Sequence, residues 1–373
     1  MTHSATPNDV GRILRHQVER HLEAPQQAIL LPPMMIWGPP GVGKSAIIRS
    51  LCEEKGIGFV DIRLSQREPV DLRGLPVPRE DRVDWLLSGE WPRDPDSSGI
   101  ILFDELTAAD RSLQVAAYEL ILDRRLGDLY ELPPGWMVVA AGNRTEDRAV
   151  AGMFSSALAN RFCHLEMSAD LEDWFQWANA RGVHTDVIAF LRFQPQAFFD
   201  MSGNVEQGWP SPRSWEKVSQ VLHQVGEHLP ASSLNLMIEG LVGTGVATEF
   251  LAFREQSSLL PDVAAMLDRR QPVTIPERAD QRYAFATTLA RTVWPSTTAA
   301  DSDRLAGFFQ VSEQLPSDFA TLALLDLMEA SEPKVREQRM SRIFAHERFN
   351  NWSEQHGAVF AEHFRANETR RCA

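Results

Sequence analysis

The chain has 373 residues, of which 43% are hydrophobic and 24% charged, values typical of a folded protein with a sizeable core. Its formal net charge of -14 argues against broad nucleic-acid binding, because phosphate contacts need a surplus of basic side chains. No apolar run of about 18 residues or more occurs, and residues 1–20 lack the apolar core of a secretory signal. We therefore expect no membrane segment and a cytoplasmic location.

The cysteines do not indicate a disulfide framework or a zinc site. Cys52, Cys163 and Cys372 lie far apart, and no CxxC pair is present. An odd number of scattered cysteines argues against either kind of site.

Apolar strand-like runs alternate with helical patterns over the first 141 residues. Such alternation, with strands that are apolar on both faces, predicts a parallel sheet covered by helices on both sides. Between 66 and 98 the chain is rich in Pro, Gly and Asp and shows few periodic signals. The predicted helices are 9–23, 45–55 and 108–124, and the predicted strands are 34–37, 58–64, 100–103 and 136–141.

From about Ser168 onward helical patterns dominate and strand-like runs become rare. Trp, Phe and Leu recur at helical spacing, which indicates packed helices. The second half is therefore predicted to be all-helical, with helices at 170–181, 184–193, 211–228, 232–253, 280–292, 301–311 and 317–330.

A glycine-rich segment between the first strand and the next helix fits the pattern GxxxxGK[ST] of a phosphate-binding loop. Backbone N–H groups in such a loop surround phosphates, and the helix that follows adds the positive end of its dipole. Lys44 can reach the terminal phosphates, and the Ser45 hydroxyl can bind Mg²⁺. The predicted nucleotide-binding residues are Gly38, Pro39, Pro40, Gly41, Val42, Gly43, Lys44 and Ser45.

Two acidic residues follow the apolar run 100–103. Asp104 is predicted to join Ser45 in holding Mg²⁺, and Glu105 to polarise the attacking water. An alternative is that the acids only cap the next helix. The phosphate-binding loop upstream favours the catalytic interpretation.

Asn143 comes directly after the strand 136–141 and its glycine. At the carboxyl edge of a parallel sheet, its amide is expected beside the phosphate-binding loop, where it could hold the attacking water. A turn role is the alternative, because Gly142-Asn143 is a good turn dipeptide.

These motifs, together with the segment 155–162 (SSALANRF), resemble AAA+ ATPases in their order and intervals. The segments 71–76 (DLRGLP) and 211–215 (SPRSW) resemble the helix-2 insert and sensor-2 regions of the MoxR branch, which includes the CbbQ and GvpN proteins. The resemblance covers residues 28–228. It implies an α/β P-loop NTPase core of the AAA+ type with a parallel sheet, followed by an all-α lid and a C-terminal helical domain.

The resemblance assigns roles to two arginines. Arg161 resembles the arginine finger that reaches the nucleotide of a neighbouring subunit, and Arg213 resembles the sensor-2 arginine of the lid. A guanidinium there would cancel charge that develops on the transferring phosphoryl group. Surface ion pairs are the alternative for both, and Arg144 and Arg148 are competing finger candidates.

The insert 66–98 and the segment 125–135 are candidates for hairpins that face a central pore. Trp85 and Tyr130 are the aromatic residues that could grip a substrate there. The alternative is that both merely anchor loops.

The predicted organisation is an N-terminal helix at 1–27, the AAA+ core at 28–167, a helical lid with sensor 2 at 168–260, and a C-terminal helical extension at 261–373. The resemblance implies Mg²⁺-dependent ATP hydrolysis by a hexameric ring that remodels or activates a protein, chaperone-like, with a von Willebrand factor A-domain (VWA) partner. Alternatives are a nucleotide-gated scaffold with little turnover and a DNA-acting AAA+ motor, although the acidic charge weighs against the motor.

Overall fold

The computed structural model describes residues 4–144, 147, 159–203, 207–226, 228–294, 300–330 and 332–372. The chain divides into two compact units, Met1–Ala169 and Asp170–Ala373. Each unit is considered by itself below.

The first unit is built on a five-stranded parallel sheet with the order β2-β5-β8-β1-β9 in the described residues. β5 and β8 are buried along almost their whole length, which matches their continuous apolar sequence. The strands are β1 Met34–Trp37, β2 Gly58–Arg63, β5 Gly99–Asp104, β8 Trp136–Gly142 and β9 Cys163–Glu166.

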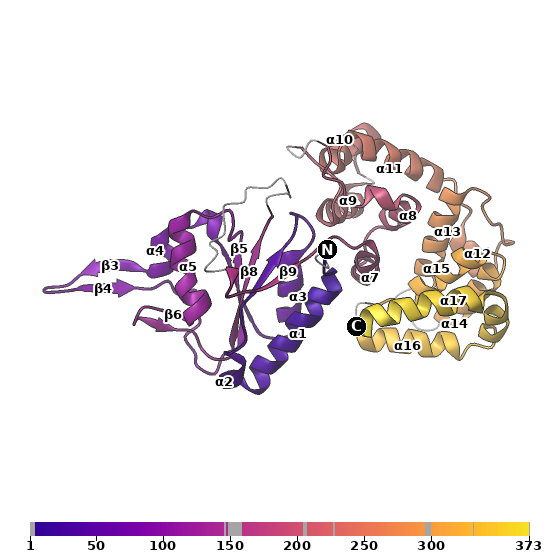
Figure 1. Cartoon of the computed structure of the whole chain (residues 1–373). Coiled ribbons are helices and arrows are strands. Elements are labelled where there is room, and N and C mark those ends of the chain that lie inside the picture. Colours follow the sequence, from indigo (N-terminus) through magenta and orange to yellow (C-terminus); the bar gives the residue numbers. More distant parts are fainter. Residues whose placement is uncertain are drawn as a thin grey trace. The chain divides into compact units, whose positions relative to one another are not determined.

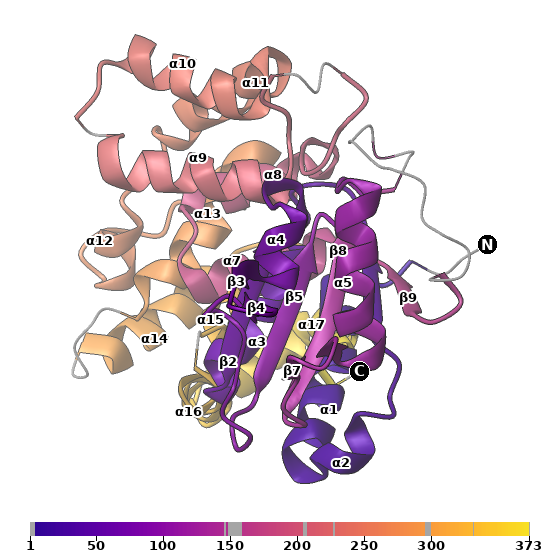
Figure 2. The same cartoon turned by 90° about the vertical axis from the view of Figure 1, so that its left-hand side faces the viewer.

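Helices cover both faces of this sheet: α4 and α5 lie on one side of the strands, and α1 and α3 lie on the other (Figures 1 and 2). From β1 the chain crosses to β2 at the far edge of the sheet and returns through β5 and β8, and β9 is then added on the other side of β1. The direction in which strands are added to the sheet therefore changes at β1. Ligands of open α/β sheets bind at such a reversal, outside the carboxyl ends of the strands. The helices of this unit are α1 Pro7–Glu23, α2 Pro25–Ala28, α3 Lys44–Lys55, η1 Leu64–Gln66, α4 Pro69–Arg73 and α5 Arg111–Asp123.

The region 66–98 contains a hairpin, for which its sequence made it a candidate although periodic signals there are few. β3 Leu75–Pro78 and β4 Val83–Leu86 pair antiparallel, and this hairpin projects away from the sheet (Figure 1). Trp85 on it is 43% exposed. A second, smaller hairpin joins β6 Arg125–Leu126 to β7 Tyr130–Glu131.

Tyr130 is buried and its hydroxyl donates to the carbonyl oxygen of Pro92 at 2.7 Å. Its ring lies 6.1 Å from that of Trp91, centroid to centroid. These contacts anchor a loop, so of the two interpretations the sequence left open, loop anchoring describes Tyr130.

The second unit is helical throughout its described residues, as predicted. One core forms around Trp215, whose buried ring lies 5.5 Å from Phe190 and 5.6 Å from Phe250. The helices are α7 Leu171–Arg181, α8 Thr185–Phe193, η3 Pro195–Ala197, α9 Pro212–Val225, α10 Ala231–Val242, α11 Thr244–Ser257, α12 Val263–Leu267, α13 Ala279–Thr292, α14 Ala300–Ser312, α15 Ser317–Met328, α16 Pro333–Phe344 and α17 Phe349–Cys372.

The single helix predicted over 232–253 is wrong, because α10 and α11 are separate helices that meet at Gly243. The φ angle of Gly243 is 81°, a conformation that glycine adopts at little cost and that ends a helix.

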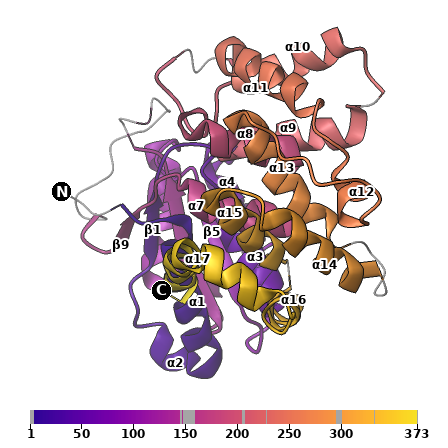
Figure 3. The ribbon, with the colours of Figure 1, turned by 90° about the vertical axis from the view of Figure 1, so that its right-hand side faces the viewer.

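Helices on both sides of residue 260 pack together in the second unit: α13 packs along α8 and α15, and α15 packs along α17 (Figure 3). The division of this unit into a lid and an extension at residue 260 stays a prediction.

Candidate nucleotide site

The phosphate-binding loop joins the end of β1 to the start of α3. Gly43 precedes the helix with φ of 102°, in the left-handed region where glycine is favoured. At Gly38 a Cβ atom would lie 2.4 Å from the carbonyl oxygen of Met167, so only glycine lets β1 pass so close to the end of β9. The sequence thus dictates both ends of the loop.

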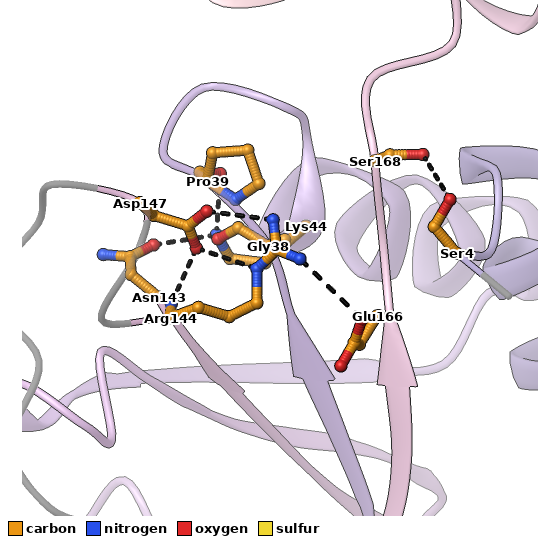
Figure 4. Close-up of polar contacts among 9 residues, drawn as sticks. All are labelled: Ser4, Gly38, Pro39, Lys44, Asn143, Arg144, Asp147, Glu166 and Ser168. Carbon is orange, nitrogen blue, oxygen red and sulfur yellow. Dashed lines mark hydrogen bonds and ion pairs between the residues drawn. The ribbon is translucent and has the colours of Figure 1, made fainter. Parts of the chain in front are cut away.

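Lys44 is 8% exposed and its ammonium is bound by its own chain. Nζ donates to the carbonyl oxygens of Gly38 at 2.6 Å and Pro39 at 3.0 Å, and to Oδ1 of Asn143 at 3.0 Å (Figure 4). The loop and the end of β8 are therefore brought together around one buried positive charge. The predicted neighbourhood of Asn143 and the phosphate-binding loop is thus observed.

The side chains of Ser45 and Asp104 contact each other at the same site. The Ser45 hydroxyl donates to Oδ2 of Asp104 at 2.5 Å, joining α3 to the end of β5. A hydroxyl and a carboxylate are the oxygen donors that Mg²⁺ accepts in proteins, usually with substrate phosphates completing the shell. This donor pair fits the predicted metal site.

Glu105 follows Asp104 in an unusual backbone conformation, with φ of 56°. A non-glycine residue with positive φ is uncommon and gathers at functional sites. Its Oε2 accepts a hydrogen bond from the hydroxyl of Ser65, which lies in η1 just after β2. Ser65 was not predicted, because 40 residues separate it from Glu105 and no local pattern marks it.

Asp61 adds a further carboxylate to the same edge of the sheet. Burial, and then the charges of Asp104 and Glu105, raise the pKa of Asp61. Its Oδ2 pairs with Arg49 at 3.2 Å, whereas its Oδ1 is buried without a hydrogen-bond partner. The edge that would receive a polyphosphate therefore already concentrates negative charge, which a divalent cation would offset.

Arg144, a competing finger candidate, is engaged within its own subunit. Its guanidinium donates to Asp147 through Nε at 3.3 Å and Nη2 at 3.0 Å, and lies 3.7 Å from Glu166 (Figure 4). Asp147 is buried, so this pair gives its carboxylate a counter-charge. The other candidate, Arg148, lies outside the described residues, as do 155–158 of the predicted finger segment.

Arg161 is exposed, just before β9, and makes no hydrogen bond or ion pair with any described residue. Its neighbour Phe162 is buried in the core of the sheet, which fixes the turn from which the guanidinium extends. Arg213 is exposed in the first turn of α9, in the second unit, where Ser211 caps the helix.

Comparison with known proteins shows a family match within the first unit. Residues 34–165 match the model of the ATPase family associated with various cellular activities (AAA). Midasin of Giardia intestinalis is 33% identical over 94 residues, which cover 25% of this chain and 2% of midasin. The chain thus spans about 2% of the length of this relative.

Two solved structures are similar at low identity. NtrX from Brucella abortus in complex with ADP shares 15% identity over 92% of this chain and 68% of its own, with a TM-score of 0.35. A RuvB mutant from Thermotoga maritima shares 12% over 74% of this chain and 81% of its own, with a TM-score of 0.36.

Residues 34–165 form an AAA ATPase domain, on the evidence of the family model. The predicted P-loop fold and the predicted enzyme class, an ATP hydrolase, are confirmed for this domain. Among the described residues, no helix has the length and apolar character needed to cross a membrane.

Proposed function

We propose that the chain hydrolyses Mg-ATP as a subunit of a ring, with Arg161 completing the active site of the neighbouring subunit. This proposal is carried by the exposure of Arg161, in contrast to Arg144, whose guanidinium is bound by carboxylates of its own subunit. A guanidinium that serves another subunit must be presented at the surface, whereas one held by two carboxylates is already neutralised.

Each residue of the site has a task in this reaction. The Lys44 ammonium would exchange its carbonyl partners for β- and γ-phosphate oxygens. Ser45 and Asp104 would hold Mg²⁺, which would supply positive charge to offset that of the phosphates. Glu105 accepts the proton of the water whose oxygen attacks the γ-phosphorus, and the bond to the β–γ bridging oxygen breaks to release ADP. The Asn143 amide orients that water.

The cellular role of this ATP hydrolysis is proposed from resemblance to the MoxR branch. The ring would be hexameric and cytoplasmic, would remodel or activate a protein in a chaperone-like way, and would act with a VWA-domain partner. Arg213 would report the state of the nucleotide to the helical lid. Recovery of a VWA-domain protein with the native chain, and its absence with Lys44→Ala, would support the partner.

A nucleotide-gated scaffold with little turnover is the second candidate. The hydrogen bond from Ser65 to Glu105 favours it, since a base already bound by a donor is less available to water. Both candidates bind ATP, so only the rate of turnover separates them.

The test is ATP turnover per subunit as a function of protein concentration, for the native chain and for Arg161→Ala. Arg20→Ala, which removes another exposed arginine of the same unit, is the matched control. We expect cooperative turnover in the native chain and the control, and turnover near zero in Arg161→Ala with ATP binding intact. Flat turnover that Arg161→Ala leaves unchanged would overturn the ring mechanism. Stimulation by DNA would instead indicate a DNA-acting motor.

A further inference from the structure

His164 bridges the strand that enters the phosphate-binding loop and the turn that carries Arg161. Its Nδ1 accepts a hydrogen bond from the Trp37 indole N–H at 2.8 Å. On the other side of the ring, Nε2 lies 2.7 Å from the carbonyl oxygen of Ala159. The ring also stacks on Trp37, with 5.9 Å between centroids and 18° between planes.

The two partners fix the state of the imidazole. The indole nitrogen is only a donor and the carbonyl oxygen only an acceptor, so Nδ1 must be bare and Nε2 must carry the proton. His164 is thus held at both ring nitrogens in one tautomer. A histidine so constrained holds its two partners at a defined separation.

Each partner belongs to a different part of the catalytic machinery. Trp37 is the last residue of β1 and directly precedes Gly38 of the phosphate-binding loop. Ala159 is helical and directly precedes the turn that holds Asn160 and Arg161, both of which are exposed. β9 has only four residues and, among the described strands, pairs with β1 alone.

A short edge strand leaves the turn before it weakly held by backbone bonds. From the turn itself, the amide of Phe162 reaches the Ala159 oxygen only at 3.5 Å, whereas His164 reaches the same oxygen at 2.7 Å. The imidazole is therefore the better-placed donor to that carbonyl.

We propose that His164 is a positioning residue, which sets the Arg161 turn against the nucleotide loop of its own subunit so that the guanidinium meets the neighbour's nucleotide. The inference rests on the proposed trans role of Arg161. His164 itself touches no reacting atom. Loss of the His164 side chain would impair ATP hydrolysis in the adjacent subunit and leave the nucleotide site of the mutated subunit intact.

The experiment measures turnover of mixed rings. His164→Ala alone should lower turnover by about 10- to 100-fold, because misplacing a charged group by about 1 Å costs that much. Its affinity for ATP should stay within about two-fold of native, since the phosphate contacts are untouched. Trp37→Phe, which keeps the ring but removes the N–H, should give a smaller loss. His16→Ala, an exposed histidine on α1, is the control and should match the native chain.

Glu105→Gln subunits are inactive but present an intact Arg161. Mixed with them, His164→Ala subunits should regain turnover above the sum of the two separate preparations. No regain, while a mixture of Arg161→Ala with Glu105→Gln does regain activity, would overturn the inference alone. No regain in either mixture would overturn the trans mechanism itself. Loss of ATP binding in His164→Ala would also overturn the inference, because His164 would then serve its own site.

Discussion

Replacing Arg144 with alanine tests whether that arginine is structural, as its contacts imply. Asp147 is buried, and the substitution would remove its counter-charge. The Asp147 carboxylate would keep the main-chain N–H of residue 144, which lies 2.6 Å from Oδ2. What is lost is the bond from Nη2 at 3.0 Å and the longer one from Nε at 3.3 Å.

The loss in free energy of unfolding caused by Arg144→Ala follows from these distances. A hydrogen bond between charged groups contributes about 1.5–3 kcal/mol. Since one of the two bonds is long and Arg144 is partly exposed, we expect a loss of about 2 kcal/mol, or about 30-fold in the unfolding equilibrium of the first unit. Asp147→Asn in the same chain should recover much of this loss, because no buried charge is then left unpaired.

Hydrogen exchange of the β1 and β8 amides reports this unit separately from the helical one. Protection should fall by about 30-fold in Arg144→Ala and by less in the double variant. Unchanged protection would show that the pair contributes nothing to stability. Regained turnover on mixing Arg144→Ala with Glu105→Gln would show that Arg144 acts in trans, contrary to our assignment.

Three further outcomes are expected. Lys44→Ala should weaken ATP binding by at least about 30-fold in calorimetric titration, because a charge-assisted contact to phosphate is lost; an unchanged Kd would remove Lys44 from the site. Trp215→Ala should cost the helical unit about 3–5 kcal/mol, because a fully buried ring and its 2.9 Å bond to the Ala197 oxygen are removed. Denaturation followed by exchange at α8 and α9 measures this cost, and a loss under about 1 kcal/mol would contradict the packing argument. Burial lowers the pKa of His21, so its stabilising effect is complete above the unfolded value near 6.5 and declines as the pH falls below it, by at most about 1.4 kcal/mol per pH unit. The drop in Tm from pH 7.5 to 5.5 should therefore be smaller in His21→Leu than in the native chain, and an equal drop would be contrary evidence.

The parts of the site that could be predicted from the sequence are those formed by residues that are close together in the sequence. The loop from Gly38 to Ser45 requires glycines and a lysine at fixed intervals, and Asp104 is delivered by a strand whose apolar run is unmistakable. The sheet followed because strands apolar on both faces can only lie between helices.

The parts that were missed depend on contacts between distant residues. Ser65 meets Glu105 across 40 positions, and His164 meets Trp37 across 127, so neither leaves a local pattern. A hairpin within 66–98 was a candidate, but its strand bounds were not predicted, because the prolines of β3 hide the strand periodicity. The helix predicted over 232–253 runs through Gly243, whose backbone in fact separates two helices.

Residues 4 and 5 lie beside the residues that end and follow β9. Ala5 forms a parallel bridge with Met167, its N–H donates to the Glu166 oxygen at 2.6 Å, and the Ser4 and Ser168 hydroxyls lie 3.2 Å apart (Figure 4). Unpaired strand edges invite pairing with other chains. Deleting residues 4–6 would therefore free the backbone groups of residues 166–168, at the end of β9, for pairing with other chains, and should promote aggregation.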